Sequence, residues 1–249
     1  MIRWVAVCVA GLWLGLGWTP IAEAHLKDYL VTQDYYTAKR GEMEVTLWND
    51  VIFPEADNDE TYKTKHQVEL EYGLTNHLQL AYYEVYTWDR TKDWERDEFK
   101  IETKYRFAEA GQWPLDVALY AEYANPNGRR ATGSDTLEGK LILSRDFGRW
   151  NAAVNLVTEK KINMGSHWDY EYTAGVSYAL TARTRLGLEV KQGLGNSKDF
   201  DFSGRQALYV VPGIYTSLTP HVRLLIGPAF GLTRISDDVQ LKSIVEIEF

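Results

Sequence analysis

The sequence has little of what most enzymes and most helical membrane proteins depend on. It contains one cysteine, Cys8, which lies in an apolar run near the start of the chain. No apolar run after Trp18 approaches the roughly 20 residues of a transmembrane helix, so we expect no helical membrane span. An excess of positive charge is also lacking, since 35 acidic residues outnumber 27 Lys and Arg and the formal net charge is -8, and this argues against nucleic acid as a partner.

Catalytic motifs are missing as well. The chain contains no G-x-S-x-G nucleophile motif, no phosphate-binding loop and no H-E-x-x-H metal motif. Its histidines are scattered rather than clustered: His25, His66, His77, His167 and His221. Acidic stretches at 55–60, 199–201 and 237–238 lack the fixed spacing of a calcium loop. We therefore expect no enzyme activity, no cofactor and no metal site.

The first 24 residues are typical of a secretory signal peptide. Arg3 precedes a short apolar run, and residues 22–24 (Ala-Glu-Ala) form an A-x-A cleavage site. We expect cleavage after Ala24, which removes the cysteine and leaves a mature chain that can form no disulfide. Residues 25–42 then precede the first predicted strand. They either lie in the periplasm or fold into the lumen of a barrel as a plug.

What the chain does have is alternation of apolar and polar residues in short segments, accompanied by 16 Tyr and 9 Trp. Five tight turns alternate with six longer polar loops, which predicts twelve strands, an even number as in outer-membrane barrels. The predicted strands are 43–53, 61–73, 78–89, 97–108, 114–124, 135–146, 149–160, 167–179, 184–195, 204–217, 221–234 and 238–249. We predict an all-β, antiparallel transmembrane β-barrel over residues 43–249, with both termini periplasmic. Ten strands are the alternative.

The last predicted strand indicates a membrane location. One face carries Leu241, Val245, Ile247 and Phe249, and the other carries Lys242, Glu246 and Glu248. An apolar face toward lipid, a charged face toward the lumen and a terminal aromatic residue are typical of the bacterial outer membrane. We expect the barrel-assembly machinery to recognise Phe249, and lipid and lipopolysaccharide to surround the barrel. A soluble barrel or β-sandwich, the alternative, would turn its apolar face inward and would need no aromatic belts.

The opposite faces of the strands carry charge that we assign to the lumen. The predicted lumen-lining residues are Lys63, Lys65, Glu69, Glu71, Lys100, Glu102, Lys104, Arg106, Asp116, Glu122, Glu138, Lys140, Glu171, Glu189, Lys191, Arg223, Lys242 and Glu246. Their basic and acidic members nearly balance. Paired charges could fill and close the lumen, or opposed walls could line a narrow pore of weak ion selectivity. Twelve strands lie between the filled and the open barrels, so size does not decide.

Three polar residues fall on the lipid-facing side instead: Asn49, His66 and Glu84. If Tyr72 pairs with Leu78, His66 lies opposite Glu84, and the three residues form a row where ionisable groups are costly. A β-bulge near Tyr82 that turns Glu84 inward is the simpler explanation. The alternatives are an interface for a second copy or another envelope protein, and an outward-facing hydrolase site.

The stretch Val68–Leu80 predicts a strand, a tight turn and a new strand, and a similar residue pattern recurs at 172–188 and 213–225. This hairpin style resembles small Gram-negative outer-membrane β-barrels classed as transporters, including the group linked to phenol-degradation pathways, over most of residues 61–249. The resemblance implies a passive outer-membrane channel or transporter for small solutes and does not identify the solute. Two alternatives are a sealed barrel with a structural or partner-binding role, and an outer-membrane lipid-modifying enzyme.

Overall fold

The computed structural model describes residues 29–54, 63–89, 92–128, 133–163, 165–201 and 205–249. The predicted signal peptide at 1–24 and the acidic loop at 55–60 lie outside the described residues. The strands are β1 (Met43–Phe53), β2 (Lys63–Gly73), β3 (Leu78–Asp89), β4 (Lys92–Arg106), β5 (Asp116–Pro126), β6 (Thr136–Phe147), β7 (Trp150–Lys161), β8 (Trp168–Ala179), β9 (Thr184–Asn196), β10 (Leu208–Thr219), β11 (Val222–Gly231) and β12 (Val239–Glu248). In these ranges no helix has the length and apolarity needed to cross a membrane.

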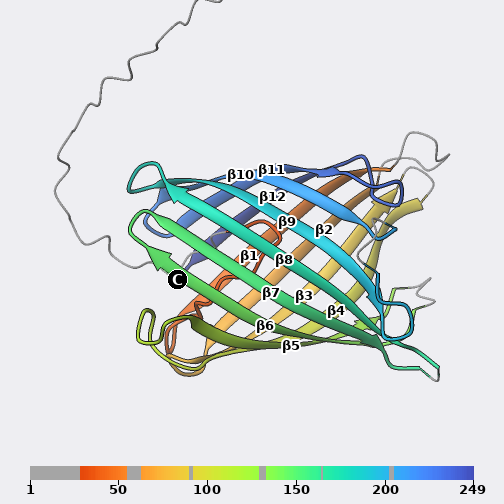
Figure 1. The fold of residues 1–249 in the computed structure, drawn as a ribbon, viewed down its shortest axis with the longest axis horizontal. Helices are drawn as coiled ribbons and strands as arrows, with labels where there is room; N and C mark the ends of the chain where they lie inside the picture. Colours follow the sequence, from red (N-terminus) through yellow and green to blue (C-terminus); the bar gives the residue numbers. More distant parts are fainter. Residues whose placement is uncertain (1–28, 55–62, 90–91, 129–132, 164, 202–204) are drawn as a thin grey trace, which may run out of the picture.

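The twelve strands close into one antiparallel barrel (Figure 1). Each strand pairs with its neighbours in the sequence, and β1 pairs with β12 to complete the ring. At the end of this seam the Phe249 amide donates a hydrogen bond to the Met43 carbonyl over 2.9 Å. The predicted all-β fold, a closed antiparallel barrel of twelve strands, is confirmed, and the ten-stranded alternative is wrong. The periplasmic location of both termini stays a prediction.

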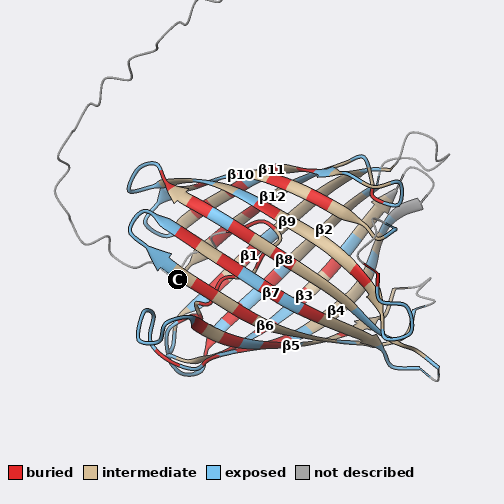
Figure 2. Cartoon of the chain, viewed as in Figure 1, coloured by how far each residue is buried: buried red, intermediate tan, exposed pale blue. Residues whose placement is uncertain are grey.

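The barrel is polar inside and apolar outside along most of its wall. In β2, Glu69 and Glu71 are 0% and 2% exposed, whereas Leu70 and Tyr72 between and beside them are each 47% exposed. Figure 2 shows the same alternation of buried and exposed positions along the neighbouring strands. Because successive side chains of a strand point to opposite faces, this pattern places the charged residues inside the ring.

Short turns at one end of the barrel share a local hydrogen-bonding motif. In the turn between β2 and β3, the Leu74 amide donates to the Leu78 carbonyl over 2.9 Å, and the Thr75 hydroxyl accepts hydrogen bonds from two turn amides. The Leu-Thr pair at 180–181 repeats these contacts between β8 and β9. A threonine hydroxyl that accepts hydrogen bonds from turn amides stabilises a tight turn between two strands. This explains why the same residue pattern recurs in the hairpins of the sequence.

Candidate functional site: the barrel lumen

The first described residues of the chain lie inside the barrel. We call residues 29–41 the N-terminal segment; it runs within the ring of strands from the short-turn end (Figure 1). Its side chains are covered by the wall, since Tyr29, Leu30 and Tyr35 are only 1–2% exposed. The segment has no regular strand or helix, so its backbone polar groups need partners from the wall.

Glu189 of β9 supplies the main acceptor for this backbone. Its carboxylate accepts hydrogen bonds from three successive amides, those of Leu30, Val31 and Thr32, over 2.7, 2.9 and 2.7 Å. The Tyr215 hydroxyl donates a fourth hydrogen bond over 2.7 Å. Glu189 itself is 0% exposed. A carboxylate that is held by so many donors binds the segment strongly, because charge-assisted hydrogen bonds are stronger than neutral ones.

Further contacts fasten the rest of the segment across the short-turn end of the lumen. Asn155 of β7 forms a reciprocal pair with the Gln33 backbone over 2.6 and 2.8 Å. On the other side of the ring, Gln79 of β3 accepts a hydrogen bond from the Ala38 amide over 2.9 Å. The segment is therefore attached to both halves of the barrel.

Tyr35 ties the middle of the segment to the turn that follows β4. Its hydroxyl donates a hydrogen bond to the Ala108 carbonyl, and its ring lies 5.8 Å from the Arg106 guanidinium. Burial raises the pKa of the Tyr35 phenol above its ordinary value, although hydrogen bonding to Arg106 acts in the opposite direction. The phenol therefore remains protonated and keeps its donor role at neutral pH.

An apolar patch on the inner wall receives the start of the segment. It consists of Ala153, Tyr209, Val211, Tyr215, Leu225, Ala229 and Ile244, all less than 9% exposed, and Tyr29 and Leu30 pack against it. Gly175 makes room for this packing, since a Cβ atom there would lie 2.6 Å from Tyr29 Cε1. This patch was not predicted, because inward positions were expected to be charged. The available signal was the run of small and apolar residues on both faces of β10 and β11.

The opposite wall presents three inward lysines to the lumen, and we call it the basic wall although Glu102, Glu122 and Glu138 also point inward from it. In the closed ring β5 lies six strands from β11 in either direction, so β4, β5 and β6 face the apolar patch across the lumen. Lys100, Lys104 and Lys140 point inward from β4 and β6, and Tyr120 lies between them on β5. The Lys140 ammonium lies 4.2 Å from the centre of the Tyr120 ring, within the range of a cation–π contact.

Most of the inward lysines are paired with carboxylates. The ion pairs are Lys65–Glu98 at 3.5 Å, Lys100–Glu122 at 3.0 Å, Lys140–Glu138 at 2.9 Å, Lys191–Glu171 at 3.2 Å and Lys242–Asp50 at 2.8 Å. Lys104 differs: it is 2% exposed and makes neither an ion pair nor a hydrogen bond with any residue that the structure describes. Its neighbour Glu102 accepts a hydrogen bond from the Tyr83 hydroxyl.

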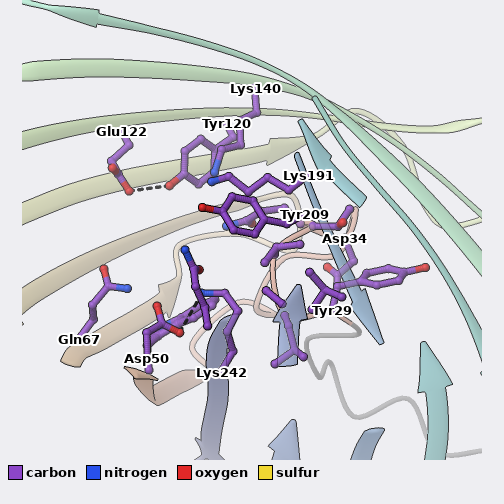
Figure 3. Close-up of a pocket in the computed structure, with 18 of the residues that line it drawn as sticks. Tyr29, Asp34, Asp50, Gln67, Tyr120, Glu122, Lys140, Lys191, Tyr209 and Lys242 are labelled. Carbon is purple, nitrogen blue, oxygen red and sulfur yellow. Dashed lines mark hydrogen bonds and ion pairs between the residues drawn. The ribbon is translucent and has the colours of Figure 1, made fainter. Parts of the chain in front are cut away.

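A cavity of about 430 Å³ remains between the basic wall and the N-terminal segment (Figure 3). Residues 29–34 of the segment form one side of it, and strands from around the ring supply the others. Six of the predicted lumen residues line it: Lys100, Lys104, Glu122, Lys140, Lys191 and Lys242. Sequence reasoning did not identify Trp48, Gln67, Tyr83, Tyr120, Tyr209 or Gln240, which also line it.

The other predicted lumen residues lie away from this cavity. Glu69, Glu71, Glu102, Asp116, Glu189, Arg223 and Glu246 are buried, Lys65, Glu138 and Glu171 are half-buried, and Lys63 is exposed. Arg106 is held at the short-turn end, where its Nε atom donates to the Asn76 carbonyl over 2.6 Å. Among the residues that the structure describes, no group of His, Cys, Asp and Glu side chains has the arrangement of a metal site.

The predicted row on the outer face is wrong in one pairing. Asn49 does lie opposite His66, and their side chains are joined by a 2.8 Å hydrogen bond. Glu84, however, lies opposite Val68, because Tyr72 pairs with Leu80 rather than with Leu78. Leu78 instead closes the turn through its carbonyl, which shifts the register by two residues. The His66 ring contacts the Trp94 ring at 4.9 Å between centres, with the two planes tilted by 44°.

The predicted bulge near Tyr82 is also wrong. Tyr83 and Val85 remain inside, at 5% and 0% exposure, so Glu84 stays on the outer face. The irregularity lies in β4 instead, where Val85 pairs with Glu98 and the next residue pairs with Arg96. This extra residue brings Arg96 to the outer face, and its guanidinium forms two hydrogen bonds with the Glu84 carboxylate, over 2.5 and 2.6 Å. The bulge thus supplies a partner for the outward carboxylate.

Comparisons with known proteins address the fold. No family model matches the chain, and no curated protein matches its sequence. An outer membrane channel from Pseudomonas putida F1 superimposes with a TM-score of 0.64 at 12% identity, over 87% of this chain and 98% of that one. The NanC porin and the KdgM porin give TM-scores of 0.55 and 0.54 at 11% and 10% identity, each over 83% of this chain and 98% of theirs. At these identities the likeness shows a shared fold, that of small outer-membrane barrels.

Proposed function

We propose that this protein is a passive channel of the bacterial outer membrane that carries small solutes. The observation that supports it most is the cavity of about 430 Å³ between the basic wall and the N-terminal segment, inside a closed barrel. A barrel whose lumen retains wet, polar space can conduct, whereas smaller barrels are filled by side chains. The similar structures include an outer membrane channel and two porins, which agrees with this role. Membership in the group linked to phenol-degradation pathways stays a prediction.

The membrane setting rests on the outer surface of the barrel. Exposed aromatic residues lie at both ends: Phe107, Trp113, Phe147 and Trp150 near the short turns, and Phe53, Trp94, Trp168 and Phe230 near the longer loops. Exposed aliphatic residues such as Leu119, Leu156 and Leu188 lie between them. Two aromatic belts around an aliphatic band match the two interfaces and the core of a bilayer. Short turns then face the periplasm, and Phe249 serves as the assembly signal.

We further propose that the N-terminal segment acts as a plug that narrows the channel without closing it. Its attachment to Glu189, Asn155 and Gln79 places it across the short-turn end of the lumen. A sealed barrel with a structural or partner-binding role is the second candidate. The ion pairs do not favour it, since Lys100–Glu122 and Lys242–Asp50 each join neighbouring strands along the wall. The N-terminal segment favours it, because its attachment across the short-turn end restricts the passage of solutes.

Single-channel recording decides between these two functions. We expect mature protein (residues 25–249), refolded and inserted in a planar bilayer, to show reproducible small conductance steps with weak ion selectivity. Weak selectivity follows from the near balance of inward basic and acidic residues. Insertion is verified separately by the heat-dependent shift in gel mobility. A barrel that inserts but stays silent would instead establish the sealed reading.

The Glu84–Arg96 pair gives a test of the lipid-facing surface. We expect Arg96→Leu to lower the urea midpoint of unfolding, because it leaves the Glu84 carboxylate on the lipid side with a hydrogen bond from the Tyr82 hydroxyl but no cation. Adding Glu84→Leu should restore most of that loss. Urea unfolding in lipid vesicles, followed by tryptophan fluorescence, measures Arg96→Leu, Glu84→Leu and the double variant. If the effect of the double variant on unfolding equals the sum of the effects of the two single variants, the two side chains are not coupled. In that case water reaches the outer face of the barrel at this depth.

A further inference from the structure

One buried cation in the lumen, Lys104, forms no ion pair with any residue that the structure describes. Lys104 lies on β4 between Gln79 of β3 and Tyr120 of β5, and it is 2% exposed. Of the described residues, none accepts a hydrogen bond from its ammonium or forms an ion pair with it. A buried charge without a partner is costly, so an unpaired ammonium on a cavity wall favours an anion from outside the protein.

Two neighbouring carboxylates accept hydrogen bonds from groups other than Lys104. Glu102, two residues before Lys104 on the same face, accepts a hydrogen bond from the Tyr83 hydroxyl. Glu122 accepts hydrogen bonds from Lys100 over 3.0 Å and from the Tyr120 hydroxyl over 2.7 Å. The cavity lining as a whole has five lysines against three carboxylates, which leaves an excess of positive charge. An anion that binds Lys104 therefore does not need to displace a described ion pair.

The size and composition of the cavity indicate an organic anion. A volume of about 430 Å³ is far more than a bare inorganic ion fills, and it lies within the usual range for small-molecule sites. Trp48, Tyr83, Tyr209 and Val31 contribute apolar surface around the lysines. Such a lining favours a molecule with an apolar body and one anionic group, because the polar contact fixes orientation while apolar contacts provide most of the affinity.

We propose that this cavity is a binding site for small amphiphilic monocarboxylates, with the carboxylate on the Lys104 ammonium. The inference rests on the proposed channel function, because it names the class of solute that such a channel would select. The apolar part of the solute lies against Val31, Trp48 and Tyr209. The N-terminal segment therefore forms part of the site as well as narrowing the lumen.

Calorimetric titration of the full mature protein in detergent micelles tests the proposal, with empty micelles as the blank. Hexanoate is the probe. Hexanamide has the same apolar body without charge, and acetate has the charge without the body. We expect hexanoate to bind most tightly and the other two at least about tenfold more weakly. Equal binding of hexanamide would overturn the carboxylate assignment, and equal binding of acetate would overturn the apolar one.

Substitution of Lys104 locates the binding. Lys104→Gln should weaken hexanoate binding about 10- to 100-fold, as expected for the loss of one charged hydrogen-bonding partner, while Lys104→Arg retains it. Lys198→Gln, in an exposed loop, makes the same charge change elsewhere and should have no effect. Wild-type affinity in Lys104→Gln would refute the site. The titration does not require conduction, so a silent barrel that binds hexanoate overturns only the channel function, and a conducting barrel that does not bind overturns only this inference.

Discussion

A mature chain that begins at Lys39 instead of His25 is expected to conduct severalfold more current per channel than the full mature chain. The shorter chain lacks the buried part of the N-terminal segment, including Tyr29, Leu30 and Tyr35. Removing these side chains joins their volume to the existing cavity and opens the short-turn end of the lumen. Single-channel recording at matched salt and voltage measures the difference.

The control for this deletion is a chain that begins at Tyr29. It loses the first residues of the mature chain but keeps every described contact of the N-terminal segment, so its conductance should equal that of the full mature chain. Both truncated chains must insert as folded barrels, which the heat-dependent gel shift verifies. An unchanged conductance for the chain that begins at Lys39 would show that the narrowest point of the pore lies elsewhere.

Substitution of Glu189 by alanine is expected to release the start of the N-terminal segment into solvent. The amides of Leu30, Val31 and Thr32 would lose their common acceptor. Each buried donor left without a partner costs about 1–3 kcal/mol. Together they should raise the released population at least about tenfold, since 1.4 kcal/mol corresponds to a factor of ten.

A cysteine reporter measures this release directly. The only natural cysteine is Cys8, within the predicted signal peptide, so Thr32→Cys gives a mature chain with a single thiol. Thr32 is 6% exposed, and its hydroxyl makes no hydrogen bond with the residues that the structure describes, so the reporter itself disturbs little. We expect a bulky maleimide to label it slowly beside Glu189 and at least about tenfold faster in Glu189→Ala.

Glu171→Ala provides the matched control for this labelling. It also removes a carboxylate from the inner wall, where Glu171 is paired with Lys191 at 3.2 Å, but no described contact joins Glu171 to the N-terminal segment. Labelling of Thr32→Cys should therefore stay slow. Fast labelling in both variants would mean that inward charge in general retains the segment, and not the hydrogen bonds to Glu189.

The strand count could be predicted because its signals are local. Alternation has a period of two residues, and turns such as Leu74–His77 carry threonine and asparagine at positions that stabilise a reversal. The pairing of Glu84 could not be predicted in the same way. It depends on which atom closes that turn, and a change of two residues leaves every side chain on the same face. Hydrophobic pattern alone does not distinguish the two registers.

The hydrogen bonds between the Glu189 carboxylate and the N-terminal segment could not be predicted from local sequence patterns either. The carboxylate was assigned to the lumen as one charge among many, and its partners are backbone amides, which leave no trace in the sequence. The inner apolar patch had a visible signal, because Val211 and Tyr215 share a face of β10 on which a polar pattern was expected. Only the docking of Tyr29 and Leu30 explains why that face is apolar.

The distance along the chain between the N-terminal segment and its partners bears on how the barrel assembles. The contacts of Tyr29 and Leu30 join residues 122 to 159 positions apart, whereas most wall contacts join adjacent strands. Closing so long a loop costs conformational entropy before any contact compensates for it, so such contacts form late. Residues that emerge first during secretion therefore reach their native place only after β9 has been added. The seam between β1 and β12 joins residues still farther apart, such as Asp50 and Lys242 at 192 positions, so the same entropy cost makes both the lumen contacts and the closure of the wall late events.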